Sequence, residues 1–353
     1  MPVSTTNPLR DDLDHILAHT QGLWDDLRGQ RLFITGGTGF FGCWLLESFA
    51  WANDALGLNA EAVVLTRDPN AFGRKAPHLA GHPAIHLDAG DVRTFTFPKG
   101  RFSHVIHAAS ELNAKLNTEQ PLLILDTIIE GTRHTLDFAV RAGAKKFLLS
   151  SSGAVYGKQP PEMMHLSEDY LGAPDPVDPG SAYGEGKRLA ELLCTLYHRQ
   201  HGIEAKIARC FTFVGPYLPL NTHFAIGNFI RDARAGGPIV VNGDGTPYRS
   251  YLYAADLAIW LWTILFRAPA GRPYNVGSAQ AFHVAQLAQA VADCFLPVPA
   301  LCIVRPPIPG QPAARYVPDI RRADSELGLR QSFGLQQSLK NTAARLKSDH
   351  DSI

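Results

Sequence analysis

The chain has no excess of charge of either sign. Its 353 residues include 33 Lys or Arg and 33 Asp or Glu, so the formal net charge is zero. This balance provides no extended electrostatic surface for a nucleic acid or an anionic membrane, and we expect neither as a partner. Residues 1–10 contain no apolar segment, and the most apolar run, 257–266, is too short to span a bilayer. We therefore expect a cytoplasmic protein.

Spacings typical of disulfides and metal sites are missing as well. The number of cysteines is odd and none forms a CxxC pair, which argues against a closed disulfide framework. The 14 histidines form no H-E-x-x-H or comparable ligand cluster, so we predict no metal site and expect His104 and His107 to be structural. We interpret the cysteines as small, buried, reduced side chains; they are Cys43, Cys194, Cys210, Cys294 and Cys302.

What the chain does have is a series of short apolar segments that alternate with helical ones. A hydrophobic fraction of 45% is enough for a large core. Strands that are apolar throughout and alternate with helices indicate a parallel sheet covered on both faces, so the predicted fold class is α/β, a doubly wound Rossmann sheet. The expected strands are 31–35, 62–66, 84–87, 104–109, 146–150 and 205–209, and the expected helices are 43–51, 121–142 and 183–201.

The length favours two packed lobes that share a cleft. Residues 1–28 carry apolar positions at near-helical spacing, so we expect a helical extension there, followed by an NAD(P)-binding Rossmann domain over 29–210. Beyond about residue 212 Pro and Gly become frequent. We assign residues 211–353 to a smaller α/β substrate-binding lobe, with a segment near 250–265 returning to the first domain.

A glycine-rich turn follows the first expected strand and opens a helix. Glycine lets the backbone turn sharply and approach a pyrophosphate, while the N–H groups at the helix start attract the phosphates. In this context the motif predicts a dinucleotide site rather than a structural tight turn. The expected cofactor contacts are Gly36, Thr38, Gly39, Phe40, Phe41 and Gly42.

The ends of the next strands supply further expected cofactor contacts. An acid at the end of the second strand favours NAD, and an arginine accommodates the phosphate of NADP. Arg67 favours NADP, whereas Asp68 lies one residue too far along the chain to contact the ribose. The alternative is that Arg67 and Asp68 form a solvated pair with no role in cofactor binding. We expect NAD, with NADP as the alternative that Arg67 leaves open. The other contacts are expected from Asp91, Val92, Ala108 and Ala109.

An acid–base couple lies on the helix expected over 183–201. Tyr183 and Lys187 are four residues apart, so their side chains share one face. A tyrosine normally keeps its proton at neutral pH, but an adjacent ammonium favours the phenolate, which can take a proton from a sugar hydroxyl. Tyr-x-x-x-Lys alone is also a common surface pair. A serine after the strand at 146–150 favours the catalytic interpretation; we prefer Ser152, with Ser151 as the runner-up.

Taken together, these motifs resemble the extended short-chain dehydrogenase/reductase family, and within it the NAD-dependent nucleotide-sugar epimerases and dehydratases. The resemblance covers about residues 30–330 and is specific for the superfamily rather than for a substrate. It rests on Thr35-Gly-Gly-Thr-Gly-Phe-Phe-Gly42, His107-Ala-Ala109, Ser152 before Val155-Tyr156-Gly157, Tyr183-x-x-x-Lys187, and Gly243-Asp-Gly-Thr246 followed by Arg249.

The resemblance implies a reaction. Tyr183 would be the catalytic base, Lys187 its partner and a ligand of the nicotinamide ribose, and Ser152 the partner of the substrate hydroxyl. Similar dehydratases carry an acid and a base, commonly Asp-Glu, where this chain has Gly153 and Ala154. We therefore expect a nucleotide-sugar epimerase that transiently oxidises a sugar hydroxyl.

Three alternatives stay open. A 4,6-dehydratase would need a carboxylate from elsewhere in the chain, and a net NAD(P)-dependent sugar reductase or dehydrogenase would consume cofactor at each turnover. A catalytically silent NAD(P)-sensing protein is the alternative from another class, against which the intact Ser152, Tyr183 and Lys187 argue. The carboxylates that could serve a dehydratase are Glu111, Glu162 and Glu168.

The resemblance also implies contacts with a nucleotide-diphosphate sugar. Thr212 and Ile128 stand where relatives often have Asn, so the substrate is expected to differ from the commonest hexoses. The helices at 121–142 and 183–201 lie where similar proteins pair, so we expect a homodimer. The substrate-binding residues implied are Ser110, Thr212, Asn228, Arg249 and Arg315, the last two through guanidinium contacts with phosphate.

Overall fold

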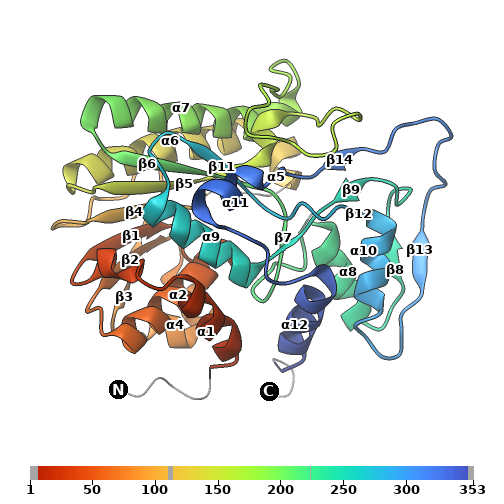
Figure 1. Cartoon of the computed structure of the whole chain (residues 1–353), viewed down its shortest axis with the longest axis horizontal. Coiled ribbons are helices and arrows are strands. Elements are labelled where there is room, and N and C mark those ends of the chain that lie inside the picture. The colour runs from red at the N-terminus through yellow and green to blue at the C-terminus, as the bar shows by residue number, and fades with distance from the viewer. Residues whose placement is uncertain (1–6, 110–113, 223, 349–353) are drawn as a thin grey trace.

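The centre of the molecule is a sheet of seven parallel strands in the order β11-β6-β5-β4-β1-β2-β3. The structure, a computed structural model, describes residues 7–109, 114–222 and 224–348. Helices cover both faces of the sheet, so the predicted α/β class is confirmed (Figure 1). The strands are β1 (Arg31–Thr35), β2 (Glu61–Thr66), β3 (Ile85–Ala89), β4 (His104–His107), β5 (Lys146–Ser152), β6 (Glu204–Cys210) and β11 (Pro273–Val276).

Alternate side chains of β1 enter two separate cores. Leu32 and Ile34 point to one face, and Phe33 points to the other, because successive side chains of a strand alternate. Figure 1 shows the two layers of helices on opposite sides of the sheet. One layer contains α1 (Arg10–His19), α2 (Phe40–Leu56) and α9 (Ala254–Arg267), and the other contains α6 (Pro121–Arg141) and α7 (Ala182–His201).

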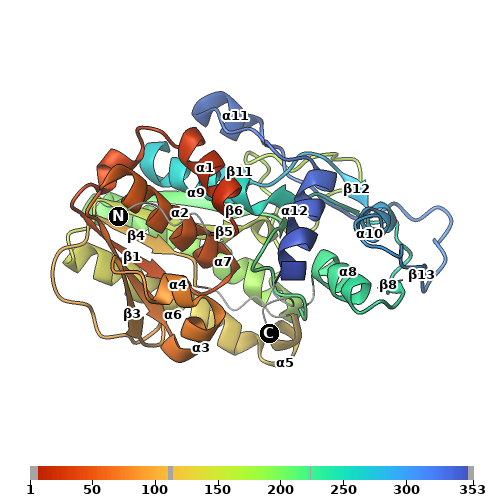
Figure 2. The same cartoon turned by 90° about the horizontal axis from the view of Figure 1, so that it is seen from below.

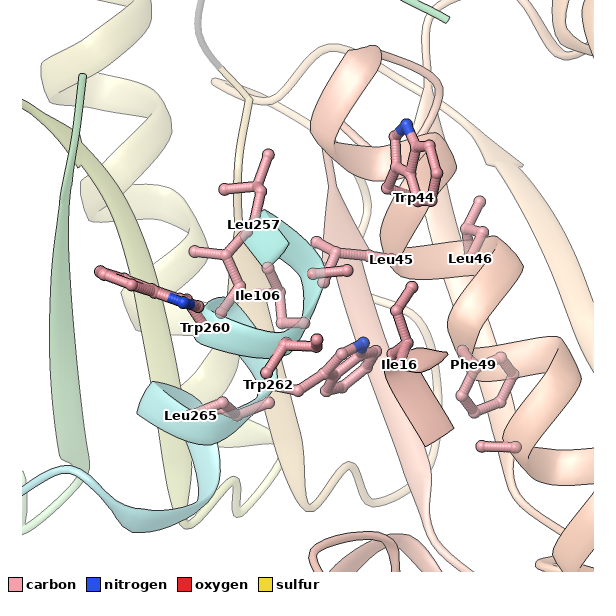
Figure 3. Close-up of a cluster of buried hydrophobic side chains, with 14 of the residues drawn as sticks. Ile16, Trp44, Leu45, Leu46, Phe49, Ile106, Leu257, Trp260, Trp262 and Leu265 are labelled. Carbon is pink, nitrogen blue, oxygen red and sulfur yellow. The ribbon is translucent and has the colours of Figure 1, made fainter. Parts of the chain in front are cut away.

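The apolar run at 257–266 belongs to α9, which is buried around its whole circumference. A helix that is hydrophobic all round belongs in a core or a membrane, and here α1 and α2 cover it. Figure 3 shows Trp262 of α9 together with Ile16 of α1 and Leu45 of α2. None of the helices in the described ranges has the length and apolar character needed to cross a membrane.

A smaller lobe lies at one end of the sheet, beside its strand ends (Figure 2). Its core is a separate cluster that includes Phe229, Ile239, Leu287 and Leu339. The lobe contains α8 (Ala225–Arg234), α10 (Val284–Ala292), α12 (Leu335–Ser348), β8 (Ile239–Val241) and β13 (Leu301–Ile303). The short remaining elements are η1 (Trp24–Leu27), α3 (Pro69–Lys75), α4 (Pro77–Ala80), α5 (Ala114–Glu119), η2 (Gly153–Tyr156), η3 (Pro179–Ser181), β7 (Phe213–Val214), β9 (Tyr248–Arg249), β10 (Leu252–Tyr253), β12 (Phe282–His283), β14 (Arg315–Tyr316) and α11 (Arg321–Leu327).

Three expectations from the sequence need correction. The seventh strand, β11, was not predicted, because its four residues begin with proline and include the buried polar residue Asn275. The strand expected over 104–109 ends at His107, which leaves the two following alanines past its carboxyl end. Three of the cysteines are buried, but Cys294, just after α10, is half-buried, and Cys302 is exposed on β13.

Candidate active site

A cavity of about 480 Å³ opens at the carboxyl ends of the sheet strands. Ligands bind at this edge in open parallel sheets. The carboxyl ends of six strands, β1 to β6, supply residues to this cavity, from the glycine turn after β1 to the start of the smaller lobe after β6. The predicted site residues that line it are Gly36, Thr38, Gly39, Phe40, Phe41, Arg67, Asp91, Val92, Ala108, Ala109, Ser152, Tyr183 and Thr212.

The glycine turn is shaped by two close approaches. Gly36 has φ +71°, and a Cβ there would lie 2.5 Å from the carbonyl carbon of Ala108. A Cβ at Gly42 would lie 2.3 Å from Gly37, so Gly42 lets α2 pack on the turn and does not itself line the cavity. Gly39, the residue before α2, offers no side chain to the first N–H groups of that helix. The first N–H groups of α2 and the glycine backbone of the turn are suited to binding a pyrophosphate.

Two arginines reach the cavity at the ends of β2 and β3. Arg93 binds the carboxylate of Asp91 through Nε at 2.9 Å and Nη2 at 2.8 Å. This charge-assisted pair lowers the pKa of Asp91 to about 2. Arg67 lines the cavity, whereas the Asp68 carboxylate accepts from the backbone N–H of Ala71 at 2.9 Å and so caps α3. Sequence reasoning missed Arg93, although its spacing from Asp91 was visible.

A buried histidine holds the first strand against α6. The His107 ring lies 2.8 Å from the Thr35 hydroxyl and 3.1 Å from the Thr132 hydroxyl. Burial lowers its pKa to about 3, so the ring is neutral. The Thr35 hydroxyl also accepts from the N–H of Ala109 at 3.3 Å, which positions the cavity wall. Within the described ranges, no group of three His, Cys, Asp or Glu side chains could hold a metal ion.

Tyr183 and Lys187 meet the cavity differently. Tyr183 lies in the first turn of α7 and lines the cavity. Lys187 lies behind it, 1% exposed, and its Nζ donates to the Ser150 carbonyl oxygen at 2.7 Å. Burial lowers the pKa of Lys187 to about 8. The Nζ lies 5.8 Å from the centre of the Tyr183 ring, so its charge favours the ionised phenol.

The serines at the end of β5 have different partners. The Ser151 hydroxyl donates to Glu191 Oε1 at 2.6 Å. The Ser152 hydroxyl accepts from the N–H of Ala154 at 3.1 Å and lines the cavity. Ser150 and Ser151 line the cavity as well, but the Ser151 hydroxyl already donates to Glu191, so Ser152 remains the preferred candidate for a substrate role.

A buried polar network lies beneath these serines. Arg209 and Glu191 form an ion pair whose side chains are 15% and 12% exposed, at 2.7 Å. Arg209 Nη1 also donates to the Tyr156 hydroxyl at 2.9 Å, which in turn donates to Asn275 Oδ1 at 2.7 Å. The network links β6, η2 and β11, and it fixes the end of β5 from below.

The two arginines expected to contact phosphate come together on neighbouring strands. In the β9–β14 pair Arg315 is opposite Tyr248, and Tyr316 is opposite Arg249. The Arg315 guanidinium lies 3.8 Å from the centre of the Tyr248 ring. Because paired residues share a face, Arg249 and Arg315 occupy opposite faces of this small sheet. Neither arginine lines the main cavity.

The other predicted substrate residues are dispersed. Thr212 lines the cavity, and its hydroxyl donates to the Ser250 carbonyl oxygen. Asn228 instead lines a separate hollow of about 350 Å³ and accepts from Arg231 Nη1 at 3.0 Å. Ser110 lies outside the described residues.

The loop before α8 closes one side of the cavity, and sequence reasoning missed it. It is anchored to α2, because the Tyr217 hydroxyl donates to Glu47 at 2.5 Å and the Trp44 indole donates to the Pro216 carbonyl oxygen at 2.9 Å. The prolines of this loop mark it as irregular, but they do not show where it folds. Its cavity-lining residues are Leu218, Pro219, Thr222 and Phe224.

Comparisons with known proteins agree with this geometry. The profile of the NAD-dependent epimerase/dehydratase family matches residues 32–277. UDP-glucuronic acid decarboxylase 6 of Arabidopsis thaliana is 33% identical over 312 residues, which cover 88% of this chain and 86% of that protein. UDP-glucuronic acid decarboxylase 1 of Xenopus tropicalis is 32% identical over 316 residues, which cover 89% of this chain and 71% of that protein.

Solved structures share the fold at lower identity. An epimerase from Methanothermobacter thermautotrophicus superimposes with a TM-score of 0.77 at 21% identity, covering 98% of both chains. A dTDP-glucose 4,6-dehydratase from Streptomyces venezuelae, solved with NAD bound, gives a TM-score of 0.76 at 23% identity, covering 91% of this chain and 98% of that one.

Proposed function

The chain belongs to the NAD-dependent epimerase/dehydratase family, and we propose that it is an epimerase of a nucleotide-diphosphate sugar. The proposal has two parts. The first is the reversible oxidation of a sugar hydroxyl, for which Ser152, Tyr183 and Lys187 are suited. The second is that the oxidised sugar is turned over and reduced again, without loss of water.

The cavity fits NAD along one wall. The residues that would hold it are those of the glycine turn, Arg67, Asp91 and the two alanines after β4. A side chain at Gly36 would collide with the backbone of Ala108, so the glycine lets this turn lie directly against the segment that follows β4. When bound, NAD supplies a hydride acceptor that can return the hydride to the sugar carbon.

The chain's own residues would handle the proton. Tyr183 takes the proton of the substrate hydroxyl at its phenol oxygen, and the Lys187 ammonium stabilises the ionised phenol. Ser152 holds the same substrate oxygen from the end of β5. Lys187 is in turn fixed by the Ser150 carbonyl, so all three groups depend on the same strand end.

The observation that carries the choice of an epimerase over a dehydratase is the lack of a usable second carboxylate among the described residues. Among the described residues that line the cavity, Asp91 is the only carboxylate, and Arg93 binds it at the adenosine end. Glu168 is buried and accepts from the Asn275 N–H at 2.8 Å, and Glu162 is exposed outside the cavity. Glu111 lies outside the described residues. Elimination of water needs an acid and a base that the described lining of the cavity does not provide.

Decarboxylation is the second candidate, because curated relatives that are 32–33% identical are UDP-glucuronic acid decarboxylases. Once a hydroxyl β to a carboxylate is oxidised, the ketone can accept the electrons of the breaking carbon–carbon bond. The loss of carbon dioxide therefore does not need the acid and the base that dehydratases carry at the positions of Gly153 and Ala154. A carboxylate on the substrate would need a cation nearby. Arg249 is a candidate, because it shares a sheet face with Tyr316, whose hydroxyl oxygen lies 2.6 Å from the place of a Cβ on Gly153, the residue after Ser152.

We further propose that Arg249 binds the diphosphate, because a planar guanidinium group suits phosphate oxygens. Arg315 lies on the opposite face of the small sheet, over the Tyr248 ring, so we assign the diphosphate to Arg249 alone.

We also propose that the protein is a homodimer. The helices α6 and α7 pack together and expose leucines at helical spacing on their outer surface, as a helix-pair interface requires. These leucines are Leu122, Leu189, Leu192 and Leu196.

The test is to incubate the purified protein and NAD with UDP-, dTDP-, GDP- and CDP-sugars, including UDP-glucuronic acid, and to weigh the products. An unchanged mass with a new chromatographic position supports epimerisation. Loss of water indicates a dehydratase, and loss of carbon dioxide a decarboxylase. Tyr183→Phe should abolish turnover while NAD binding and the thermal unfolding midpoint stay close to those of the parent protein. If that variant kept most of its turnover, the assigned proton transfer would be wrong.

A further inference from the structure

Two consecutive residues of the loop before α8 enter different cores. Tyr217 packs against the core that contains α2 and α9, whereas Leu218 belongs to the core of the smaller lobe and lines the cavity. Tyr217 has φ +69°, a left-handed backbone conformation that residues other than glycine adopt rarely and at a cost in free energy. A strained residue between two cores needs partners that hold it in place.

The partner of the Tyr217 phenol is a buried carboxylate on α2. Glu47 is 2% exposed, and its Oε1 accepts from the Tyr217 hydroxyl at 2.5 Å. The same oxygen lies 2.7 Å from Nε2 of His78 on α4, and Oε2 accepts from the Asn7 amide at 3.2 Å. A carboxylate is costly to bury unless such groups bind it. Glu47 is therefore held from three segments of the chain, and it offers the phenol a fixed acceptor.

Two further contacts tie the loop to the cofactor side of the site. The Trp44 indole of α2 donates to the Pro216 carbonyl oxygen at 2.9 Å. Lys75 of α3 donates to the carbonyl oxygen of Thr38, in the glycine turn, at 2.8 Å. The Nζ of this lysine also lies 5.8 Å from the centre of the Tyr217 ring, within the range of a cation–π contact. The strained residue thus lies between the glycine turn and the loop that closes the cavity.

We propose that Glu47 is a positioning residue for the substrate side of the cavity and that it acts through Tyr217. By holding the phenol, its carboxylate keeps the loop in the conformation that presents Leu218 and Pro219 to the cavity. Glu47 itself does not line the cavity. The inference rests on the proposed function, because this wall is opposite the glycine turn and would contact the nucleotide sugar.

The strain sets the direction of the effect. Without its acceptor, Tyr217 can relax from the left-handed conformation, and Leu218 then no longer stays against the cavity. Substrate binds tightly only to the molecules whose wall is in place, so the apparent affinity falls with the fraction of such molecules. Once substrate is bound, the wall is formed and the groups at the end of β5 and on α7 act as before. Loss of the contact should therefore raise KM and spare kcat.

A double-mutant cycle followed by steady-state kinetics tests this role. Tyr217→Phe should raise the KM of the nucleotide sugar that the protein turns over about tenfold and change kcat less than about twofold. In the Glu47→Met background the same change should add almost nothing, because the phenol has already lost its acceptor. Glu47→Gln keeps an acceptor oxygen and should retain a KM close to that of the parent protein. An equal effect in both backgrounds, or a lower kcat at unchanged KM, would overturn the inference.

Tyr274→Phe is the matched control. The Tyr274 hydroxyl donates to Glu326 Oε2 at 2.6 Å, in a second tyrosine–carboxylate bond that joins β11 to α11. Neither of these residues lines the cavity, so this substitution should leave KM unchanged. A rise in KM equal to that of Tyr217→Phe would mean that any lost bond of this kind weakens substrate binding, which contradicts a specific role for Glu47.

A second measurement needs no substrate. The ¹⁵N-indole signal of Trp44, assigned by its loss in Trp44→Phe, reports on the hydrogen bond to the Pro216 carbonyl beside Tyr217. This signal should shift in Tyr217→Phe and not in Tyr274→Phe. An unshifted signal in Tyr217→Phe would overturn the inference even in an active enzyme. If no nucleotide sugar reacts, the proposed function fails, while the signal still decides whether the phenol holds the loop.

Discussion

The Lys187 ammonium donates a hydrogen bond to the Ser150 carbonyl oxygen, 2.7 Å away. This bond ties α7 to the end of β5. Tyr183 begins the same helix and Ser152 ends the same strand, so one buried contact sets the distance between the proposed base and the proposed substrate partner. The cost of burying the lysine is visible in its pKa, which falls to about 8.

Activity should fall as pH rises through about 8, because Lys187 loses its proton there and no longer favours the ionised Tyr183. Lys187→Met should lower kcat/KM about 100-fold and remove this alkaline decline. Lys187→Arg is the control, since a guanidinium stays charged, so its residual activity should not decline near pH 8. A decline at the same pH in all three proteins would assign it to another group.

Stability should respond to the same group in the opposite direction. The Lys187 pKa is about 8 in the folded protein against an ordinary 10.5, so the unfolded chain binds more protons between these values. The unfolding free energy of the parent protein should therefore rise between pH 8 and 10.5, relative to that of Lys187→Met, by about 3 kcal/mol. Urea unfolding of both proteins across this range measures the difference, and parallel curves would contradict the assignment.

Gly36→Ala should damage both folding and cofactor binding. Its φ of +71° and a Cβ 2.5 Å from Ala108 combine backbone strain with a steric clash, so we expect a loss above about 3 kcal/mol. Gly57 is a matched control: it has φ +57° but no neighbour within 4 Å, so Gly57→Ala should cost only about 1 kcal/mol. Equal shifts of the two urea midpoints would mean that the approach to Ala108 is not limiting.

Breaking the buried pair below the serines should be costly. Glu191→Gln leaves Arg209 with an uncompensated charge, and we expect a loss of about 3 kcal/mol together with lower activity. The exposed pair of Arg330 and Asp324 provides the comparison, because Arg330→Gln should cost less than about 0.5 kcal/mol. Thermal and urea unfolding would show whether only the buried pair matters.

Arg67 should affect NADP much more than NAD. Arg67→Ala removes a cation from the cavity wall, so binding of NADP should weaken about tenfold or more, and binding of NAD by less than about twofold. Arg74→Ala, on the exposed part of α3, should change neither affinity. Fluorescence titration with the reduced cofactors gives both constants, and an equal loss for the two would place Arg67 away from the ribose.

Part of this site could be predicted because its signals are local. The glycine turn works through backbone geometry at consecutive residues, and the tyrosine and lysine share a helix face at a fixed spacing. The alternation of apolar strands with helices likewise predicted six strands and the parallel sheet. In contrast, β11 is a strand only because it pairs with β6, which no feature of its four residues indicates.

The sequence alone determined the class of fold, the glycine turn between β1 and α2, and the placement of Tyr183 and Lys187 on one helix, because in each the residues concerned are neighbours in the chain or repeat at a regular period. Only the tertiary structure decided that Arg93 binds Asp91, that Glu191 holds Ser151, and that the loop before α8 closes one side of the cavity. Those relations depend on side chains brought together by strand order and by packing of the smaller lobe. Contacts between distant segments are set by the free energy of the whole fold, so short patterns carry no record of them.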